Sequence, residues 1–277
     1  MKTLLIPYLI WNFIALLFQI CIILLPISGF ASKYSLSFSL SNILSCFWNY
    51  DGSIMGQNIT YGLPILGPTG FLKDLMIVVL FTPIIYYILK NNIARMYLIV
   101  IGGLWLYNRV MEISFYFPIS ALFFFSLGAY MSINKKNMMM EFDRIKRQTA
   151  ILFLLFFFIS YYVYSISVFK VYEIFKSLNI FLGLVVAFNI SVWLLKRGYC
   201  KVNNFLSSFS FFLYISHTII CGRMLKVLFI IVQPENDMLI FICYCLTIIF
   251  TTLFLMLIYY IMKQYTPAFL TFITGRK

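Results

Sequence analysis

One segment of the sequence places six polar or reactive side chains on a single helical face. At ~100° per residue, side chains three or four positions apart share a face of an α-helix. Tyr214 and His217 have this spacing, and His217 is the only histidine of the chain. A histidine exchanges protons near neutral pH, and a tyrosine hydroxyl donates or accepts hydrogen bonds. The spacing therefore predicts a polar, ligand-binding stripe that comprises Asn203, Ser207, Ser210, Tyr214, His217 and Cys221.

The opposite side of the same helix is bulky and apolar. Phe209, Phe212, Ile215 and Ile219 point away from the stripe. Because unpaired polar groups are costly in hydrocarbon, we expect the polar stripe to face the interior of a helix bundle. A second interpretation stays open, in which His217 forms a hydrogen bond with a neighbouring helix and has no role in catalysis. A histidine with no nucleophile nearby in the sequence does not by itself define a general base.

Two pairs of charged residues are further candidates for a binding site. Lys73 and Asp74 lie at the start of an apolar segment, where they either line a polar cavity or anchor the helix at the membrane interface. Arg109 and Glu112 are three residues apart on a predicted helix, so they can form an ion pair, either in a cavity or in water. The predicted substrate-binding residues are Lys73, Asp74, Arg109, Glu112, Tyr214 and His217.

Arg223 and Lys226 lie about two helical turns beyond His217. Such cations can bind an anionic group of a substrate, or their side chains can extend to the membrane surface.

The composition requires a lipid environment for these residues. Hydrophobic residues make up 63% of the 277 residues and charged ones only 10%, whereas soluble domains carry about 25% charged residues. The net charge of +13 is then distributed between the two membrane faces, and we expect no nucleic-acid partner. Six cysteines without a C-x-x-C pair, together with one histidine, predict no metal site. No glycine-rich phosphate loop is present.

Long apolar runs predict an all-α polytopic membrane protein with about eight transmembrane helices. A helix needs ~20 mostly apolar residues to cross a bilayer. We expect one membrane domain over residues 1–277, with no internal repeat. The predicted spans are Leu4–Leu25, Phe71–Leu89, Ile93–Tyr107, Ile113–Ile133, Thr149–Phe169, Ser177–Leu195, Phe205–Val232 and Met238–Met262.

The basic residues predict the orientation of these helices. With eight alternating spans and a cytoplasmic N-terminus, Lys and Arg favour the cytoplasmic side by roughly two to one. The opposite orientation would place the basic loop 134–148 outside. Both termini are therefore predicted to be cytoplasmic.

Six segments, in order along almost the whole chain, resemble the acyltransferase-3 family of bacterial membrane O-acyltransferases. The segments are TLLIPYLIWN (Thr3–Asn12), FWNYDG (Phe47–Gly52), GPTGFLKDLMIVVLFTPIIYYILK (Gly67–Lys90), FFFSLGAYMSI (Phe123–Ile133), LSSFSFFLYISHTII (Leu206–Ile220) and PAFLTFITGRK (Pro267–Lys277).

This resemblance implies a membrane O-acyltransferase of the bacterial cell envelope. It implies transfer of an acetyl group from acetyl-CoA to a hydroxyl of a cell-surface glycan or its lipid-linked precursor, that is, polysaccharide modification by O-acetylation. The implied location is the bacterial plasma (inner) membrane, with several passes. The implied partners are the lipid bilayer and the glycan acceptor, whereas nothing indicates the oligomeric state.

The sequence departs from the family pattern at three points. Gly70 stands where the family usually has tryptophan, and Lys73 stands where it usually has arginine, which keeps the charge but loses the bidentate geometry. The family's catalytic signature, a basic residue followed ten positions later by a histidine, has no counterpart, because no histidine precedes His217. We therefore expect a member that lacks the first helical hairpin, and the catalytic base stays unassigned.

His217 is a weak candidate for that base, and positioning of the substrate is its expected role. Two alternatives remain: a catalytically inactive homologue, and a transporter or exporter component of a polysaccharide pathway.

Overall fold

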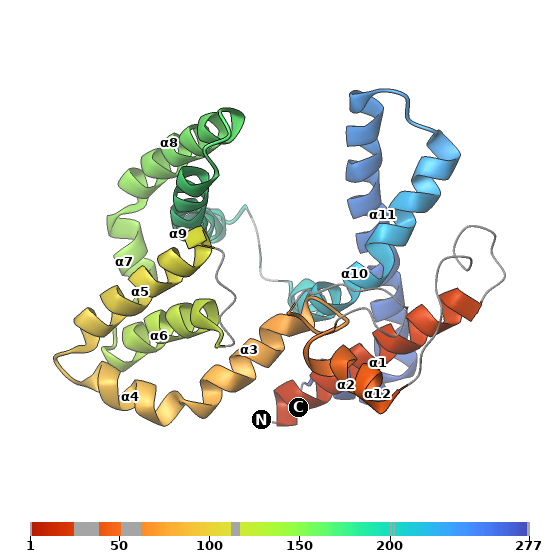
Figure 1. The fold of residues 1–277 in the computed structure, drawn as a ribbon, viewed down its shortest axis with the longest axis horizontal. Helices are drawn as coiled ribbons and strands as arrows, with labels where there is room; N and C mark the ends of the chain where they lie inside the picture. Colours follow the sequence, from red (N-terminus) through yellow and green to blue (C-terminus); the bar gives the residue numbers. More distant parts are fainter. Residues whose placement is uncertain are drawn as a thin grey trace. The chain divides into compact units, whose positions relative to one another are not determined.

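The computed structural model describes residues 2–24, 39–50, 62–111, 117–199, 201 and 203–275. Within these ranges the chain forms twelve α-helices and no strand (Figure 1). The predicted all-α class is confirmed. The helices group into two compact units, residues 1–76 with 203–277 and residues 77–202. The prediction of one membrane domain stays a prediction.

The first unit contains the two ends of the chain and the polar stripe. It comprises α1 (Lys2–Leu24), α2 (Leu40–Trp48), the first part of α3 (Thr69–Leu80), α10 (Asn204–Val232), α11 (Asp237–Tyr265) and α12 (Pro267–Thr274).

Aromatic side chains form the core of this first unit. The ring of Phe212 lies 5.4 Å from that of Trp11 and 5.5 Å from that of Tyr259. The indole Nε1 of Trp11 donates a hydrogen bond to the carbonyl of Ile273 (3.0 Å), so the buried ring satisfies its only donor. The core thereby joins α1, α10, α11 and α12.

Asparagine caps fix where the two longest helices begin. The side-chain oxygen of Asn203 accepts hydrogen bonds from the amides of Phe205 and Leu206, and that of Asn236 accepts one from Leu239. These bonds satisfy amides that have no partner within the helix.

The second unit contains the rest of α3 together with α4 (Thr82–Lys90), α5 (Ala94–Met111), α6 (Ile119–Ile133), α7 (Met138–Arg144), α8 (Lys146–Ser165) and α9 (Phe169–Lys196). Val78, Ile85, Leu89 and Ala94 form a buried apolar cluster in this unit.

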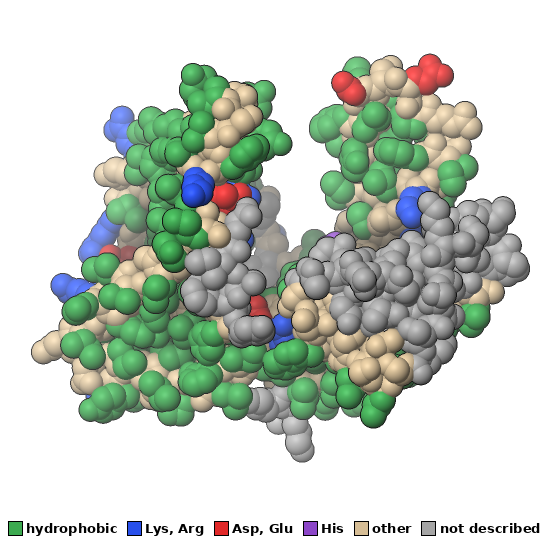
Figure 2. Space-filling view, viewed as in Figure 1, with side chains coloured by type: hydrophobic (Ala, Val, Ile, Leu, Met, Phe, Trp, Pro, Cys, Tyr) green, Lys and Arg blue, Asp and Glu red, His purple; other side chains and the backbone are tan. Residues whose placement is uncertain are grey.

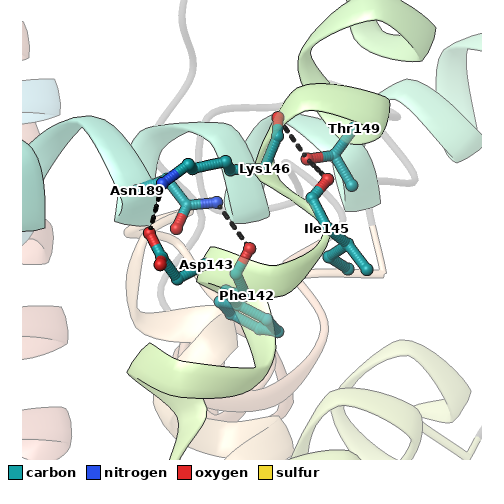
Figure 3. A network of polar contacts seen from close by, with 6 residues as sticks. All are labelled: Phe142, Asp143, Ile145, Lys146, Thr149 and Asn189. Carbon is teal, nitrogen blue, oxygen red and sulfur yellow. Dashed lines mark hydrogen bonds and ion pairs between the residues drawn. The ribbon is translucent and has the colours of Figure 1, made fainter.

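A polar network joins α7, α8 and α9 (Figure 3). Asn189 on α9 donates from Nδ2 to the carbonyl of Phe142 (3.1 Å), and Lys146 Nζ lies 2.9 Å from Asp143 Oδ1. This exposed ion pair lowers the pKa of the Asp143 carboxyl through its hydrogen bond to Lys146 and through the charge of that lysine. The predicted basic loop 134–148 therefore contains a short helix docked on α9.

Five helices are long and apolar enough to cross a membrane: α1, α8, α9, α10 and α11. A sixth predicted span, Phe71–Leu89, is the pair α3 and α4, bent by 62°. The remaining two predicted spans correspond to α5, which contains Arg95 and Arg109, and to α6, which has only 15 residues. Hydrophobic side chains cover much of the described surface visible in Figure 2, as expected for contact with lipid.

Candidate functional site

A buried asparagine fixes the start of α3 against α1. The Asn12 side chain is fully buried, and its Nδ2 donates to the carbonyl of Tyr8 (2.7 Å) and to the hydroxyl of Thr69 (2.9 Å). Its Oδ1 accepts from the amide of Leu66 (3.2 Å). A side chain with this many partners in an apolar helix holds the loop before α3 in one geometry.

Lys73 is bound mainly to the protein itself. Its Nζ donates to the carbonyls of Gly62 (3.1 Å) and Trp48 (3.3 Å) and lies 5.4 Å from the centre of the Trp48 ring. Only 9% of the residue is exposed. The ammonium therefore joins the end of α2 and the loop at residue 62 to α3, and it supplies positive charge beside Asp74.

Asp74 provides a carboxylate that no described residue binds. The residue is half-buried on α3, and the described part of the chain contributes neither a hydrogen bond nor an ion pair to it. It interacts electrostatically with Lys73 and with the phenol of Tyr8, whose hydroxyl donates to the carbonyl of Phe47. A carboxylate can accept hydrogen bonds at both oxygens, so Asp74 is available to a ligand that donates them.

Tyr214 joins the polar stripe of α10 to the same start of α3. Its hydroxyl donates to the carbonyl of Pro68 (2.9 Å), and its ring meets the edge of Phe71 with centroids 6.4 Å apart. Asp74 follows Phe71 by three residues and His217 follows Tyr214 by three, so each lies on the contacting face of its helix. The structure thus brings Lys73, Asp74, Tyr214 and His217 into one unit, on two helices in contact.

His217 forms its hydrogen bonds within its own helix. Its Nδ1 lies 2.8 Å from the carbonyl oxygen of Tyr214 and 3.1 Å from that of Leu213. Both carbonyls only accept, so Nδ1 carries the proton, and in the neutral ring Nε2 keeps a free lone pair. The expected bond from His217 to a neighbouring helix is absent from the described residues, because the preceding turn of α10 satisfies the ring instead.

The polar stripe lies outside the buried core of its own unit, and the expectation that it faces the interior of the helix bundle stays a prediction. Phe209, Phe212 and Ile215 are the buried face of α10, whereas Tyr214 is 40% exposed and His217 is partly exposed. The aromatic face is buried because it packs against Trp11 and Tyr259. Within this unit the stripe is therefore open to a ligand.

The other predicted pair is not part of this arrangement. Arg109 is near the end of α5 in the second unit, and Glu112 lies outside the described residues. Their predicted ion pair and their predicted role in substrate binding stay predictions.

Asn12 and Thr69 were missing from the predicted site. The signal available in the sequence was the amide of Asn12 in the middle of an apolar run of about 20 residues, since such a group is costly in hydrocarbon unless it has a partner. Its partner is 57 residues away in sequence, and no local pattern identifies it.

The glycine at position 70 agrees with this geometry. A Cβ atom at Gly70 would lie 2.8 Å from Leu63 Cδ2, so the loop packs directly against the bare backbone there. A tryptophan at position 70 would require Leu63 to move.

Among the described residues, no group of three or more histidine, cysteine or acidic side chains is arranged to hold a metal ion.

Comparison with known proteins gives one match. Residues 1–273 match the model of an acyltransferase domain, that of the acyltransferase-3 family. No curated protein and no solved structure gives a significant match.

Proposed function

This chain belongs to the acyltransferase-3 family, and from that premise we propose that it transfers an acetyl group from acetyl-CoA to a hydroxyl of a cell-surface glycan or its lipid-linked precursor. The family and the apolar helices make it a multi-pass membrane acyltransferase. The donor, the acceptor and a bacterial inner-membrane location are part of the proposal.

The acceptor class is inferred from two hydrogen-bond acceptors for which the described residues supply no donor. The Asp74 carboxylate and the Nε2 atom of His217 both accept hydrogen bonds, and both lie beside the contact between Tyr214 and Pro68. Sugar hydroxyls are donors of the matching kind. This chemistry favours a polyhydroxylated acceptor over an anionic one at these two residues.

In the proposed reaction, the acceptor oxygen forms a bond to the acetyl carbonyl carbon and the carbon–sulfur bond of the thioester breaks. The hydroxyl proton leaves to a base, and the coenzyme A thiolate takes up a proton. His217 binds the acceptor hydroxyl through Nε2, and Asp74 binds a neighbouring hydroxyl. The base itself stays unassigned, since the chain has one histidine and that residue serves in binding.

A kinetic experiment on the purified protein in lipid nanodiscs tests this proposal. Radiolabelled acetyl-CoA and a panel of neutral and acidic oligosaccharides serve as donor and acceptors. Asp74→Leu and His217→Leu are expected to raise the acceptor KM about tenfold, since each removes the hydrogen-bond acceptor that binds the substrate, and to leave the KM for acetyl-CoA within about twofold. Lys170→Ala, a change on the exposed surface of α9, is the control.

The results distinguish the alternatives. A fall in kcat with unchanged acceptor KM in both variants contradicts the binding role. An inactive homologue, the first alternative, binds the acceptor but releases no coenzyme A. A transporter moves the oligosaccharide into sealed vesicles with no acetyl transfer.

A further inference from the structure

An apolar groove runs along α10 in the first unit, on a different part of the helix surface from the polar stripe. Its cavity has a volume of about 640 Å³ and is bounded by α1, α10, α11 and α12. A second apolar cavity of about 470 Å³ shares Met224, Val227 and Phe254 with the first. From Phe212 to Ile231, the groove follows α10 for about 28 Å, close to the thickness of a bilayer core. Nearly all of its wall is hydrocarbon.

Among the described residues that line this groove, Arg223 is the one that carries a charge. Its guanidinium lies 4.4 Å from the centre of the Phe18 ring and donates to the carbonyl of Ile219, one turn back along α10. A side chain extending to the membrane surface would point toward the nearer, C-terminal end of the helix, and Arg223 points away from it. The structure therefore favours anion binding over membrane anchoring for this residue.

No protein carboxylate neutralises Arg223 in the described part of the chain. The ion pairs there join Glu141 to Arg144, Asp143 to Lys146 and Glu173 to Lys176, all in the second unit. A charge within a membrane span needs a partner, and the planar guanidinium suits the oxygens of a phosphate. The ligand that satisfies this site carries both the anion and the apolar body.

We propose that the groove binds a single-chain lipid phosphate, with its phosphate on Arg223 and its hydrocarbon chain between α10 and α11. A volume of about 640 Å³ is in the range of pockets that enclose one small molecule, roughly 300–1,000 Å³. An apolar helix in this groove would bring no anion to Arg223, whereas a lipid phosphate brings both an anion and a hydrocarbon chain. This inference deepens the proposed function, because it specifies the lipid-linked form of the acceptor.

Fluorescence quenching of Trp11, which lines the groove, tests the proposal. The probes are a mid-chain dibrominated octadecyl phosphate and the corresponding dibrominated octadecanol, added to protein in phosphatidylcholine nanodiscs. Trp11→Phe gives the background from the other three tryptophans. We expect saturable quenching by the phosphate at a concentration about tenfold lower than that of the alcohol, since the phosphate adds charge-assisted hydrogen bonds.

Matched variants separate charge from shape. In Arg223→Ala, the phosphate is expected to need the same concentration as the alcohol to quench Trp11. Arg147→Ala, at an exposed arginine, is expected to leave the quenching concentrations of both probes unchanged. Val227→Phe, which narrows the groove, is expected to weaken both probes. Val100→Phe, at a valine of similar exposure on α5, is its control.

Four results would overturn the proposal. In the first two, the phosphate and the alcohol bind equally tightly, or inorganic phosphate alone displaces the probe. In the other two, dibrominated phosphatidylglycerol binds as tightly as the phosphate probe, or the protein forms a dimer that excludes all probes. Quenching requires no acetyl transfer. If the lipid phosphate does not bind but acetyl transfer is intact, only the proposed role of the groove is rejected. If the lipid phosphate binds but no acetyl group is transferred, only the proposed reaction is rejected.

Discussion

At the scale of single residues, the hydrogen bonds of Asn12 determine the position of the candidate site. The fully buried amide joins the backbone of α1 to Thr69 and Leu66 at the start of α3. Asp74 follows one and a half turns later on α3, so its direction depends on how this start is held. The asparagine has a structural role in a site whose proposed ligand contacts lie elsewhere.

Replacement of Asn12 by alanine is expected to destabilise the protein by about 1–3 kcal/mol, because it leaves the buried Leu66 amide without its acceptor, whereas the Thr69 hydroxyl keeps its bond to the Leu66 carbonyl. Denaturant titration in detergent micelles measures this change. Asn134→Ala is the control, since Asn134 is exposed and bonds only to its own helix. Equal stability of the two variants would contradict the role given to Asn12.

The chemistry of the site residues could be predicted from the sequence, but their directions could not. Residue type and spacing identified Lys73, Asp74, Tyr214 and His217, which the structure places in one unit. Two features depended on contacts remote in sequence. Packing of Phe212 on Trp11 turns the polar stripe of α10 away from the core of the first unit. The ammonium of Lys73 donates its hydrogen bonds to the carbonyls of Gly62 and Trp48.

At the scale of elements, the end of α12 packs closely against the start of α1. Gly275 has φ +67°, and a Cβ atom there would lie 2.2 Å from the carbonyl oxygen of Thr3. The added Cβ atom would clash with backbone, so no rearrangement of a side chain can remove the clash. Only glycine meets both requirements, the left-handed conformation and the missing side chain.

Gly275→Ala is therefore expected to cost more than the ~1–2 kcal/mol of a left-handed alanine. Gly198→Ala provides the comparison, because Gly198 has φ +73° and no atom lies within 4 Å of the position that its Cβ would take. Thermal unfolding in the same detergent gives both values. Equal losses in the two variants would mean that α12 can move away from α1 without cost.

Element types were predictable where apolar runs were long. Helices α8 to α11 follow the predicted spans because each offers about 20 or more apolar residues. The predicted span Phe71–Leu89 is broken between α3 and α4, where Pro83 in the first turn of α4 lacks the amide that would continue the hydrogen-bond pattern. A proline in an apolar run is compatible with a kinked or a continuous helix, and packing in the second unit decides between them.

At the scale of the whole molecule, the charge distribution predicts which loops lie on the same side of the membrane. The loop between α6 and α7 contains Lys135 and Lys136, and the loop between α10 and α11 contains Glu235. The excess of basic residues predicts that the first loop lies in the cytoplasm and the second outside.

Single cysteines at these loops test the orientation. In a cysteine-free background, Lys136→Cys is expected to react with a membrane-impermeant maleimide only after the cells are permeabilised, whereas Glu235→Cys reacts in intact cells. Both positions are exposed, so accessibility within the protein is matched. Labelling of both in intact cells, or of Lys136→Cys alone, would contradict the predicted orientation.

The bend between α3 and α4 has a consequence for the lipid around it. Their 12 and 9 residues would extend about 32 Å if collinear, which matches a bilayer core of about 30 Å. With a 62° bend, they extend only about 24 Å along the axis of α3. A span this short is accommodated by local thinning of the bilayer. The hydrocarbon barrier is then thinner beside the helix that carries Asp74, which shortens the path of any group that the proposed reaction passes across the membrane.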